Sequence, residues 1–303
     1  MDDIIKQIEE KYNALGQNPE TYLKGLLHSK PLNYWDYVQV DALLNLQIQR
    51  TVYADEMIFI IYHQVTELLL KLIKHELEQV IFSENITPEV FTEKMERSCR
   101  YTEILNSSFG VMSKGMNYED YNKFRLSLAP ASGFQSVQFR EIEIYTTDLI
   151  NLVKHGFKEK ATSVEESFNY LYWLDAGLDR KTGNKSLTLQ QFEEKYLQHL
   201  IVLAYRCKKI NIAQKFALIN SSGNNFDALK NSLRKFDYLF NIKWPLTHLE
   251  TAESYLIEKG VKRAATGMSD WQKYLHPSYQ RRIFFPQLWS EDELKTWGHF
   301  TLS

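Results

Sequence analysis

The sequence has few of the residues that mark secreted, nucleotide-binding or membrane-spanning proteins. Its 303 residues include two cysteines, Cys99 and Cys207, which form neither a CxxC motif nor a disulfide framework; we expect buried thiols in a reducing cytoplasm. Only 12 glycines occur, and no GxGxxG or GxxxxGK[ST] loop is present, which argues against nucleotide binding by such loops. No apolar run reaches the roughly 20 residues that cross a bilayer, and the acidic N-terminus does not resemble a signal peptide.

Charge and metal-binding motifs are equally sparse. The formal net charge is −2, without a long basic or acidic block, so we expect no nucleic acid and no membrane among the partners. Eight histidines occur, but no HExxH and no paired Cys/His spacing supports a zinc site. Aromatic residues are abundant, at 14% of the chain. They permit a roomy ligand site, although a large core would explain them equally well.

Helical periodicity dominates the chain, and alternating β patterns are rare. We therefore expect an all-α protein, with one large helical domain over residues 1–303. The segment 55–82 carries apolar residues on nearly every face, which is typical of a buried central helix. Further helices are predicted over 88–106, 136–154, 187–206 and 226–259, the last of them broken at Pro245.

Three residues could carry chemistry, although the residues alone leave each of them open. His63 lies within the most apolar helix, with Phe59 and Glu67 one turn to either side, but a lone histidine there is more often part of a core. His248 follows Trp244 by one turn and gives a weaker signal. Arg125 could clamp a carboxylate with its planar fork or simply cap a helix.

Three segments read together resemble the tryptophan 2,3-dioxygenase family. They are DEMIFIIYHQVTELLLKLIKHEL from Asp55, FRLSLAPASGFQSVQFREIE from Phe124, and YWDYVQVDALL from Tyr34. The likeness is dense over residues 34–143 and thinner beyond, where Trp244 and His248 keep the spacing at the family's haem ligand. We identify the chain as similar to this family on these motifs.

The resemblance implies a buried pocket that holds haem b, with the histidine nearest the indole acting as the distal group. His248 would be the axial ligand of the iron, and His63 would accept a hydrogen bond from the indole N–H of L-tryptophan. Phe59, Tyr121 and Leu128 would wall the indole. The remaining implied contacts are Arg125 and Thr266 with the carboxylate, Thr266 also with the ammonium group, Ser132 with the haem edge, and Tyr34, Tyr37 and Val38 with a neighbouring subunit's site.

The resemblance also implies an activity and an assembly. The enzyme would cleave the indole C2–C3 bond with O₂ to give N-formyl-L-kynurenine, the first step of tryptophan catabolism. It would be a homo-oligomer, usually a tetramer, in which residues 1–50 reach a neighbouring subunit. Two departures, Met268 and Ser269 in the loop after Thr266, and a longer segment between His248 and Thr266, leave open an aromatic-amino-acid monooxygenase or a haem sensor without turnover.

Overall fold

The computed structural model describes residues 1–178, 182–221, 226–258, 261–262 and 276–302. It divides the chain into two compact units, Met1–Ile48 and Gln49–Ser303. The first unit coincides closely with the N-terminal segment 1–50 that the resemblance singles out. The prediction of one domain over 1–303 stays a prediction.

The N-terminal unit consists of short helices without a core. None of its helices contains a buried residue, although the unit carries many large apolar side chains. Its elements are α1 (Asp2–Ala14), α2 (Pro19–Leu26), α3 (Tyr34–Val38) and α4 (Val40–Leu43).

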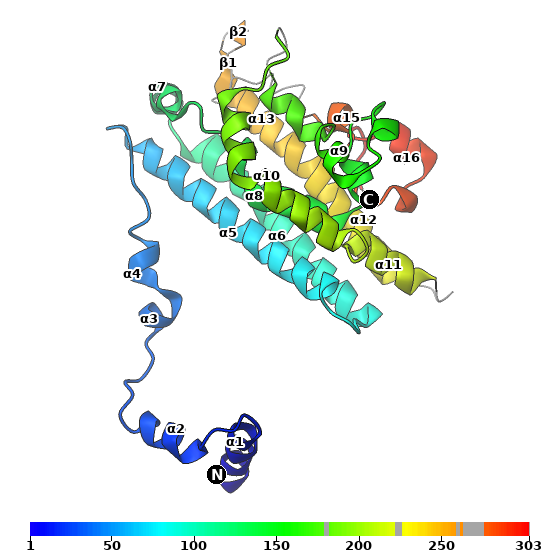
Figure 1. Ribbon diagram of the computed structural model, residues 1–303. Helices are drawn as coiled ribbons and strands as arrows, with labels where there is room; N and C mark the ends of the chain where they lie inside the picture. The colour runs from blue at the N-terminus through cyan, green and yellow to red at the C-terminus, as the bar shows by residue number, and fades with distance from the viewer. Residues whose placement is uncertain (179–181, 222–225, 259–260, 263–275, 303) are drawn as a thin grey trace. The chain divides into compact units, whose positions relative to one another are not determined.

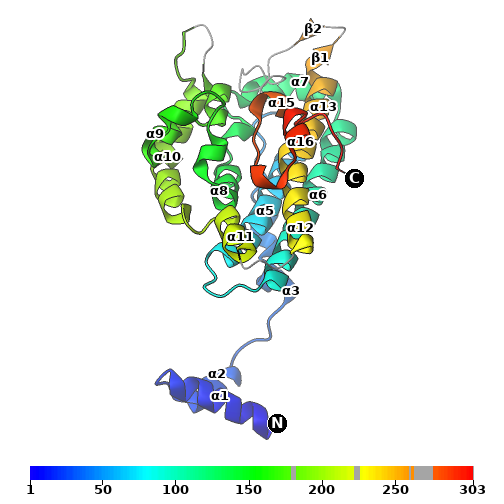
Figure 2. The ribbon, with the colours of Figure 1, turned by 90° about the vertical axis from the view of Figure 1, so that its right-hand side faces the viewer.

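The second unit is built on long helices that pack side by side. Helix α5 packs against α6 and α8, α6 also contacts α12 and α13, and α10 covers α8 (Figures 1 and 2). The bounds are α5 (Asp55–Ile81), α6 (Pro88–Gly115), α8 (Val137–Thr146), α10 (Leu187–Cys207), α12 (Asp227–Tyr238) and α13 (Trp244–Leu256). The main core lies between these helices and is rich in aromatic residues, including Phe91, Trp173, Phe236 and Phe240.

Shorter elements connect and cover the long helices. The α-helices are α7 (Tyr118–Phe124), α9 (Val164–Phe168), α11 (Ile212–Asn220), α15 (Pro277–Gln280) and α16 (Glu291–Lys295). The 3₁₀ turns are η1 (Arg125–Leu128), η2 (Gly133–Gln135), η3 (Leu149–Leu152), η4 (Lys158–Lys160), η5 (Tyr172–Gly177) and η7 (Pro286–Leu288). In the described residues the only paired strands are β1 (Ile257–Glu258) and β2 (Val261–Lys262), so the all-α prediction is confirmed in class.

Local chemistry explains where α5 begins. Asp55 and Glu56 place negative charge in its first turn, which the helix dipole favours. The buried Glu56 carboxylate accepts hydrogen bonds from Arg50 N at 2.8 Å and Thr51 N at 2.7 Å, so the incoming chain is tied to the first turn. The predicted helix 55–82 thus agrees with the structure to within one residue.

Pro245 does not break the path from α12 to α13. A π-helical turn, η6 (Leu239–Lys243), joins the two helices directly, and Pro245 occupies the first turn of α13, where its missing N–H costs little. The predicted break at Pro245 is therefore replaced by a local widening just before it.

Two other predicted helices have different lengths in the structure. Helix α6 continues to Gly115, well beyond the predicted end at 106. Helix α8 ends at Thr146 instead of continuing to 154, because Thr147 takes an extended conformation and its hydroxyl donates to Phe284 O at 2.5 Å. Threonine side chains that bond backbone groups compete with a helix, which gives the physical reason for this end.

Helix α5 is central but is not buried on every side. Ile61, Val65, Leu68 and Leu72 are between 41% and 48% exposed. Their spacing of four, three and four residues places them on one face of the helix. The prediction of a buried central helix is wrong for this face, which we call the α5 stripe. Among the described helices, none is both long and apolar enough to cross a membrane.

Candidate functional site

A cavity of about 150 Å³ lies between α5, the start of α8 and α13. It brings His63 and His248, which are far apart in the sequence, to a common space. Aromatic side chains and two arginines make up much of the remaining wall. The lining residues are Tyr62, His63, Thr66, Glu67, Leu70, Phe109, Gly133, Phe134, Ser136, Phe139, Arg140, Trp244, Pro245, His248, Gln280 and Arg282.

The hydrogen bond of His63 determines which ring nitrogen carries the proton. His63 Nδ1 lies 2.7 Å from Phe59 O, one turn earlier in α5. Because a carbonyl oxygen only accepts, Nδ1 must donate, and in the neutral ring Nε2 then keeps its lone pair. Burial lowers the pKa of His63, against weaker opposing effects of the Phe59 carbonyl and Glu67, and so favours this neutral form. His63 can therefore accept a hydrogen bond from a ligand in the cavity.

His248 is a neutral imidazole that faces the cavity. Its ring stacks on Phe109, with ring centroids 5.5 Å apart. Solvent reaches the side chain through the cavity opening, yet the surrounding protein lowers its pKa to about 4, with a smaller contribution from nearby His63. A histidine that serves only the core would be packed on all sides, whereas this one presents a neutral ring to open space. Such a ring can bind a metal ion through its lone pair.

A chain of ring contacts links His248 to His63 and continues to Tyr255, which lies on the same helix as His248. It runs from His248 to Phe109 (5.5 Å), Tyr62 (5.8 Å), His63 (5.3 Å), Phe59 (4.1 Å), Tyr121 (6.3 Å) and Tyr255 (4.8 Å). All of these centroid distances except that between His63 and Phe59 lie in the range of roughly 4.5–7 Å of favourable aromatic pairs. Helices α5, α6, α7 and α13 all contribute to this chain of ring contacts.

Two of the predicted substrate residues, Phe59 and Tyr121, belong to this chain of ring contacts. Phe59, Tyr121, Arg125 and Leu128 are not among the residues that line the cavity. Phe59, Tyr121 and Leu128 pack against one aromatic cluster, and burial raises the pKa of the Tyr121 hydroxyl. Arg125 is buried at the junction of α7 and η1, where its Nε donates to Asn122 Oδ1 at 3.1 Å. These placements bring the predicted residues together, while their roles stay predictions.

Other predicted residues lie elsewhere. Ser132 does not line the cavity, because its hydroxyl caps η2 by accepting from Phe134 N at 3.3 Å, while Gly133 and Ser136 of the same segment do line it. Thr266, with Met268 and Ser269, lies outside the described residues. Tyr34, Tyr37 and Val38 belong to the N-terminal unit and are exposed there.

Sequence reasoning missed the two arginines of the wall. Arg140 and Arg282 are each 4% exposed. A signal was present in the sequence, because each arginine lies within two residues of a phenylalanine, in QFREIE and RRIFFP, and a charge that is buried among apolar side chains needs a partner. The identity of that partner depends on packing and could not be inferred.

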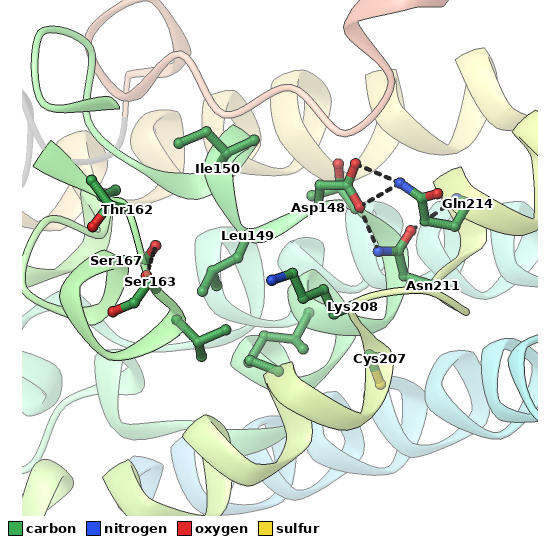
Figure 3. A pocket seen from close by; sticks show the side chains of 15 residues that line it. Asp148, Leu149, Ile150, Thr162, Ser163, Ser167, Cys207, Lys208, Asn211 and Gln214 are labelled. Atoms are coloured by element: carbon green, nitrogen blue, oxygen red, sulfur yellow. Dashed lines mark hydrogen bonds between the residues drawn. The ribbon is translucent and has the colours of Figure 1, made fainter. Parts of the chain in front are cut away.

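A second cavity, of about 360 Å³, lies beside α10 and α11 and lacks comparable chemistry (Figure 3). Its Asp148 carboxylate accepts from Asn211 Nδ2 at 2.8 Å and from Gln214 Nε2 at 2.8 Å. Its thiol, Cys207, is buried, and burial raises the pKa of that thiol to about 12, so the reactive thiolate is disfavoured. The smaller cavity with two histidines is therefore the candidate site.

Comparison with known proteins relates the chain to one family. A family model described as tryptophan 2,3-dioxygenase matches residues 24–172. A tryptophan 2,3-dioxygenase of Ralstonia pickettii is 26% identical over 86% of this chain and 92% of its own length. The chain is thus similar to the tryptophan 2,3-dioxygenase family, over just under half of its length by the family model and over most of its length by this relative.

Other members are closer over shorter stretches. A tryptophan 2,3-dioxygenase of Ruegeria sp. is 43% identical over 37% of this chain. One of Sorangium cellulosum is 41% identical over 38% of this chain. These two alignments span only 40% and 31% of the respective relatives, so less than half of each relative is matched. The residues that the family model matches, 24–172, include both His63 and Arg140.

The chemistry of the cavity wall fits a haem of the kind that the resemblance implies. Two buried polar atoms of its wall, Ser136 Oγ and Trp244 Nε1, have no hydrogen-bond partner among the described residues, and contact with a ligand would account for such atoms. No cluster of three or more metal-binding side chains occurs in the described ranges, and haem iron needs only an axial protein ligand such as His248. The cavity is smaller than the roughly 300–1,000 Å³ of typical ligand sites, so a porphyrin requires its walls to separate.

Proposed function

We propose that this chain is a haem-dependent dioxygenase that converts L-tryptophan and O₂ into N-formyl-L-kynurenine. The observation that carries the proposal is the pair of neutral imidazoles, His63 and His248, that face one aromatic-walled cavity. Similarity to the tryptophan 2,3-dioxygenase family supports the same reaction. The indole C2–C3 bond breaks, both oxygen atoms enter the product, and no external reductant is consumed.

The residues of the chain bind and orient the substrate. When bound, haem supplies the redox-active iron for the oxygen chemistry, and His248 is the residue that would hold it. His63 Nε2 is available to accept the indole N–H, because Nδ1 is already committed to Phe59 O. Phe59, Tyr121 and Leu128 would enclose the ring and exclude water.

Arg125 would bind the substrate carboxylate through its planar fork. It is buried beside Tyr121, so a carboxylate that reached it would be shielded from water, where charge-assisted hydrogen bonds are strongest. Thr266 would complete recognition of the carboxylate and ammonium groups. The protein would then hold the indole ring in place over the iron. This effect of proximity would supply much of the protein's contribution to the reaction rate.

Oxygen labelling tests the reaction. Haem-reconstituted protein with tryptophan, a reductant to prime the iron, and ¹⁸O₂ should give N-formyl-kynurenine that contains two labelled atoms. One labelled atom, or a hydroxylated indole, would indicate the monooxygenase alternative, which no relative named above favours. Absence of turnover with haem bound would indicate a sensor. The His248→Ala protein is the control, because any activity that it shows would come from haem that His248 does not hold.

We also propose a homo-oligomer, with four copies as the expected number. The N-terminal unit has no buried residue, and a unit without a core needs another surface to cover its apolar side chains. Tyr34 and Tyr37 are 72% and 75% exposed, as expected for side chains that complete a neighbouring copy's site. The α5 stripe has the spacing of a coiled-coil seam and offers a second surface for association.

The cytoplasm is the proposed location. Cys99 and Cys207 are both free and buried, which suits a compartment that keeps thiols reduced.

A further inference from the structure

The helical path that leads to His248 contains a π turn. This turn, η6, joins α12 to α13, and the two helices run nearly along one line (Figures 1 and 2). Within it, Trp244 N donates to Leu239 O, five residues earlier, whereas an α-helix would join it to the fourth. The path from α12 to α13 therefore contains one residue more than an uninterrupted α-helix would.

The extra residue determines which side chain faces the cavity. Successive residues of an α-helix are turned by about 100° around its axis, so one additional residue changes the direction of every later side chain by about this angle. In the observed register His248 lines the cavity, and its ring stacks on Phe109 at 5.5 Å. In an uninterrupted α-helical register, Thr247 would take the place of His248. The π turn thus aims the imidazole at the cavity.

The π turn leaves one buried carbonyl without a donor from the helix. Trp244 N–H, which would reach Phe240 O in an α-helix, is used on Leu239 O. The next residue, Pro245, has no N–H. Phe240 O instead accepts from Arg282 Nη2 at 3.1 Å, and both residues are buried. Because an unsatisfied buried carbonyl is costly, this side chain replaces the donor that the backbone lacks.

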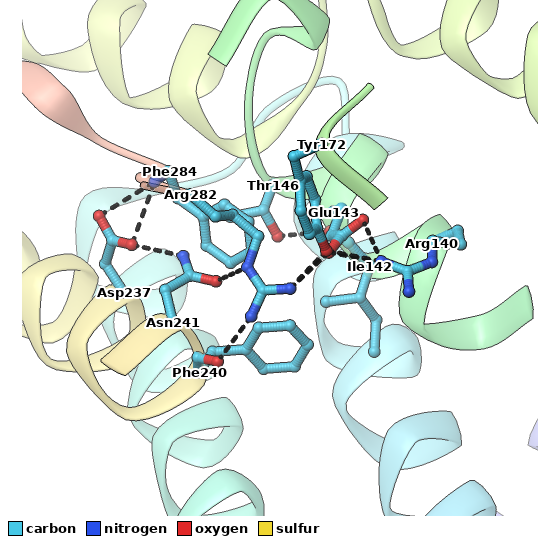
Figure 4. Close-up of polar contacts among 10 residues, drawn as sticks. All are labelled: Arg140, Ile142, Glu143, Thr146, Tyr172, Asp237, Phe240, Asn241, Arg282 and Phe284. Atoms are coloured by element: carbon cyan, nitrogen blue, oxygen red, sulfur yellow. Dashed lines mark hydrogen bonds and ion pairs between the residues drawn. The ribbon is translucent and has the colours of Figure 1, made fainter. Parts of the chain in front are cut away.

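Arg282 is held against the turn by further contacts (Figure 4). Its Nε donates to Asn241 Oδ1, which belongs to the same turn, and Asn241 Nδ2 donates to Asp237 Oδ1 at 2.6 Å. On the other side of the guanidinium, Nη1 donates to Glu143 Oε1 at 2.8 Å. The planar guanidinium therefore connects the π turn to α8, and its contacts within the fold account for its position.

The contact with Phe240 favours the π register over the α register. In the α register Trp244 N–H would donate to Phe240 O, and the carbonyl would not need Arg282. In the π register Arg282 is the donor that the structure gives to this oxygen. Loss of the guanidinium should therefore destabilise the register that aims His248 at the cavity, and leave the other register less affected.

We propose that Arg282 is a positioning residue for the haem ligand: by donating to Phe240 O it holds the π turn that aims His248 at the cavity. This inference rests on the proposed function, since it takes His248 as the ligand of haem iron. It assigns to Arg282 and to the turn a role that no contact with the substrate or the cofactor requires.

Haem binding by Arg282→Lys tests the proposal. Lysine keeps a positive charge beside Glu143, but without the planar fork it cannot also donate to Asn241 and Phe240. Apoprotein is titrated with haem and followed by the Soret band, and the iron–histidine stretching band of the ferrous protein is recorded by resonance Raman spectroscopy. Haem affinity should fall by about tenfold to hundredfold, the range of one charge-assisted hydrogen bond. The iron–histidine band should shift or weaken.

Tyr172→Phe is the matched control. It removes a hydroxyl that accepts from Arg282 Nη1 and leaves the donors to Asn241 and Phe240 in place. Its haem affinity should stay within about threefold of the wild type, with an unchanged iron–histidine band. If Arg282→Lys lowers only the melting temperature of the apoprotein, and leaves affinity and band as in the wild type, Arg282 is structural and the proposal is wrong.

Pro245→Ala shows whether Arg282 acts through the Phe240 carbonyl. Alanine at 245 restores an N–H that can donate to Phe240 O in the π register. In this background Arg282→Lys should therefore lower haem affinity by no more than about threefold. A loss as large as that in the Pro245 protein would overturn the proposal, because it would show that the carbonyl contact is not what Arg282 contributes.

A crystal structure of the wild-type apoprotein tests the turn without haem and without a variant that must fold. It should show Trp244 N–H on Leu239 O and His248 facing the cavity. Trp244 N–H on Phe240 O, with Arg282 turned elsewhere, would overturn the proposal. If the wild-type protein binds no haem, the proposed function fails, and the apoprotein structure still decides whether the turn aims His248 at the cavity.

Discussion

His63 Nδ1 lies 2.7 Å from Phe59 O, so one backbone carbonyl determines which nitrogen of His63 can accept a hydrogen bond from a ligand. The same two residues pack ring against ring at 4.1 Å. Phe59 therefore fixes both the position and the tautomer of the imidazole, and Nε2 remains the acceptor.

His63→Ala should retain haem but lose turnover. The residue orients the indole and is not the predicted iron ligand, so kcat/KM for tryptophan should fall by the roughly 10²–10⁴-fold typical of one positioned proton-handling group. His75→Ala, an exposed histidine on the same helix, is the control. Steady-state kinetics equal to the wild type would assign His63 to the core alone.

His248→Ala should abolish stable haem binding. The variant removes the neutral imidazole on α13 that faces the cavity, and His63 is already committed to its own helix through Nδ1. The measurement is the ratio of Soret to protein absorbance after gel filtration, with His155→Ala as an exposed control. An unchanged ratio in His248→Ala would rule out this ligand.

Arg125→Lys should impair tryptophan but not tryptamine. Lysine keeps the charge but not the two parallel hydrogen bonds to a carboxylate. Loss of one such bond costs about 1.5–3 kcal/mol, or about tenfold to a hundredfold in kcat/KM for tryptophan. Tryptamine lacks the carboxylate and should be a poor substrate for both proteins. Similar losses with both compounds would make Arg125 structural.

Acid should destabilise the apoprotein partly through its cavity histidines. Burial lowers the pKa of His248 to about 4 and also lowers that of His63, whereas an unfolded histidine titrates near 6.5. Below pH 6.5 the unfolded chain binds protons that the folded chain does not, so stability should fall from pH 6.5 towards 4. In His248→Gln the melting temperature should fall less over this range than in the wild type. An equal fall of the melting temperature with pH in the two proteins would show that protonation of His248 does not contribute to the acid destabilisation.

Leu68→Asp should weaken self-association. Leu68 lies within the α5 stripe and is 48% exposed, so the change places a charge in the proposed seam without touching the core. Val202→Asp, an exposed apolar residue on α10, is the control. Sedimentation velocity should show smaller species for Leu68→Asp only. An unchanged distribution would exclude the stripe as an interface.

The sequence alone determined the long helices and pointed to the histidines. Apolar periodicity and the acidic first turn act within a few residues, which is why α5 was predicted to within one residue of its observed end. The motif around His63 and the spacing of Trp244 and His248 pointed to both histidines, because each pattern can be read from neighbouring residues in the sequence.

Only the tertiary structure decided what these elements meet. Helix α8 ends at Thr146 because the Thr147 hydroxyl bonds Phe284 O, a residue far along the chain. The Arg140 and Arg282 wall likewise requires α8 and the segment after α15 to converge on Glu143. The apolar periodicity of a sequence cannot predict such contacts, because they depend on how helices that are distant in the sequence pack. Packing also determines that the α5 stripe stays uncovered within one chain.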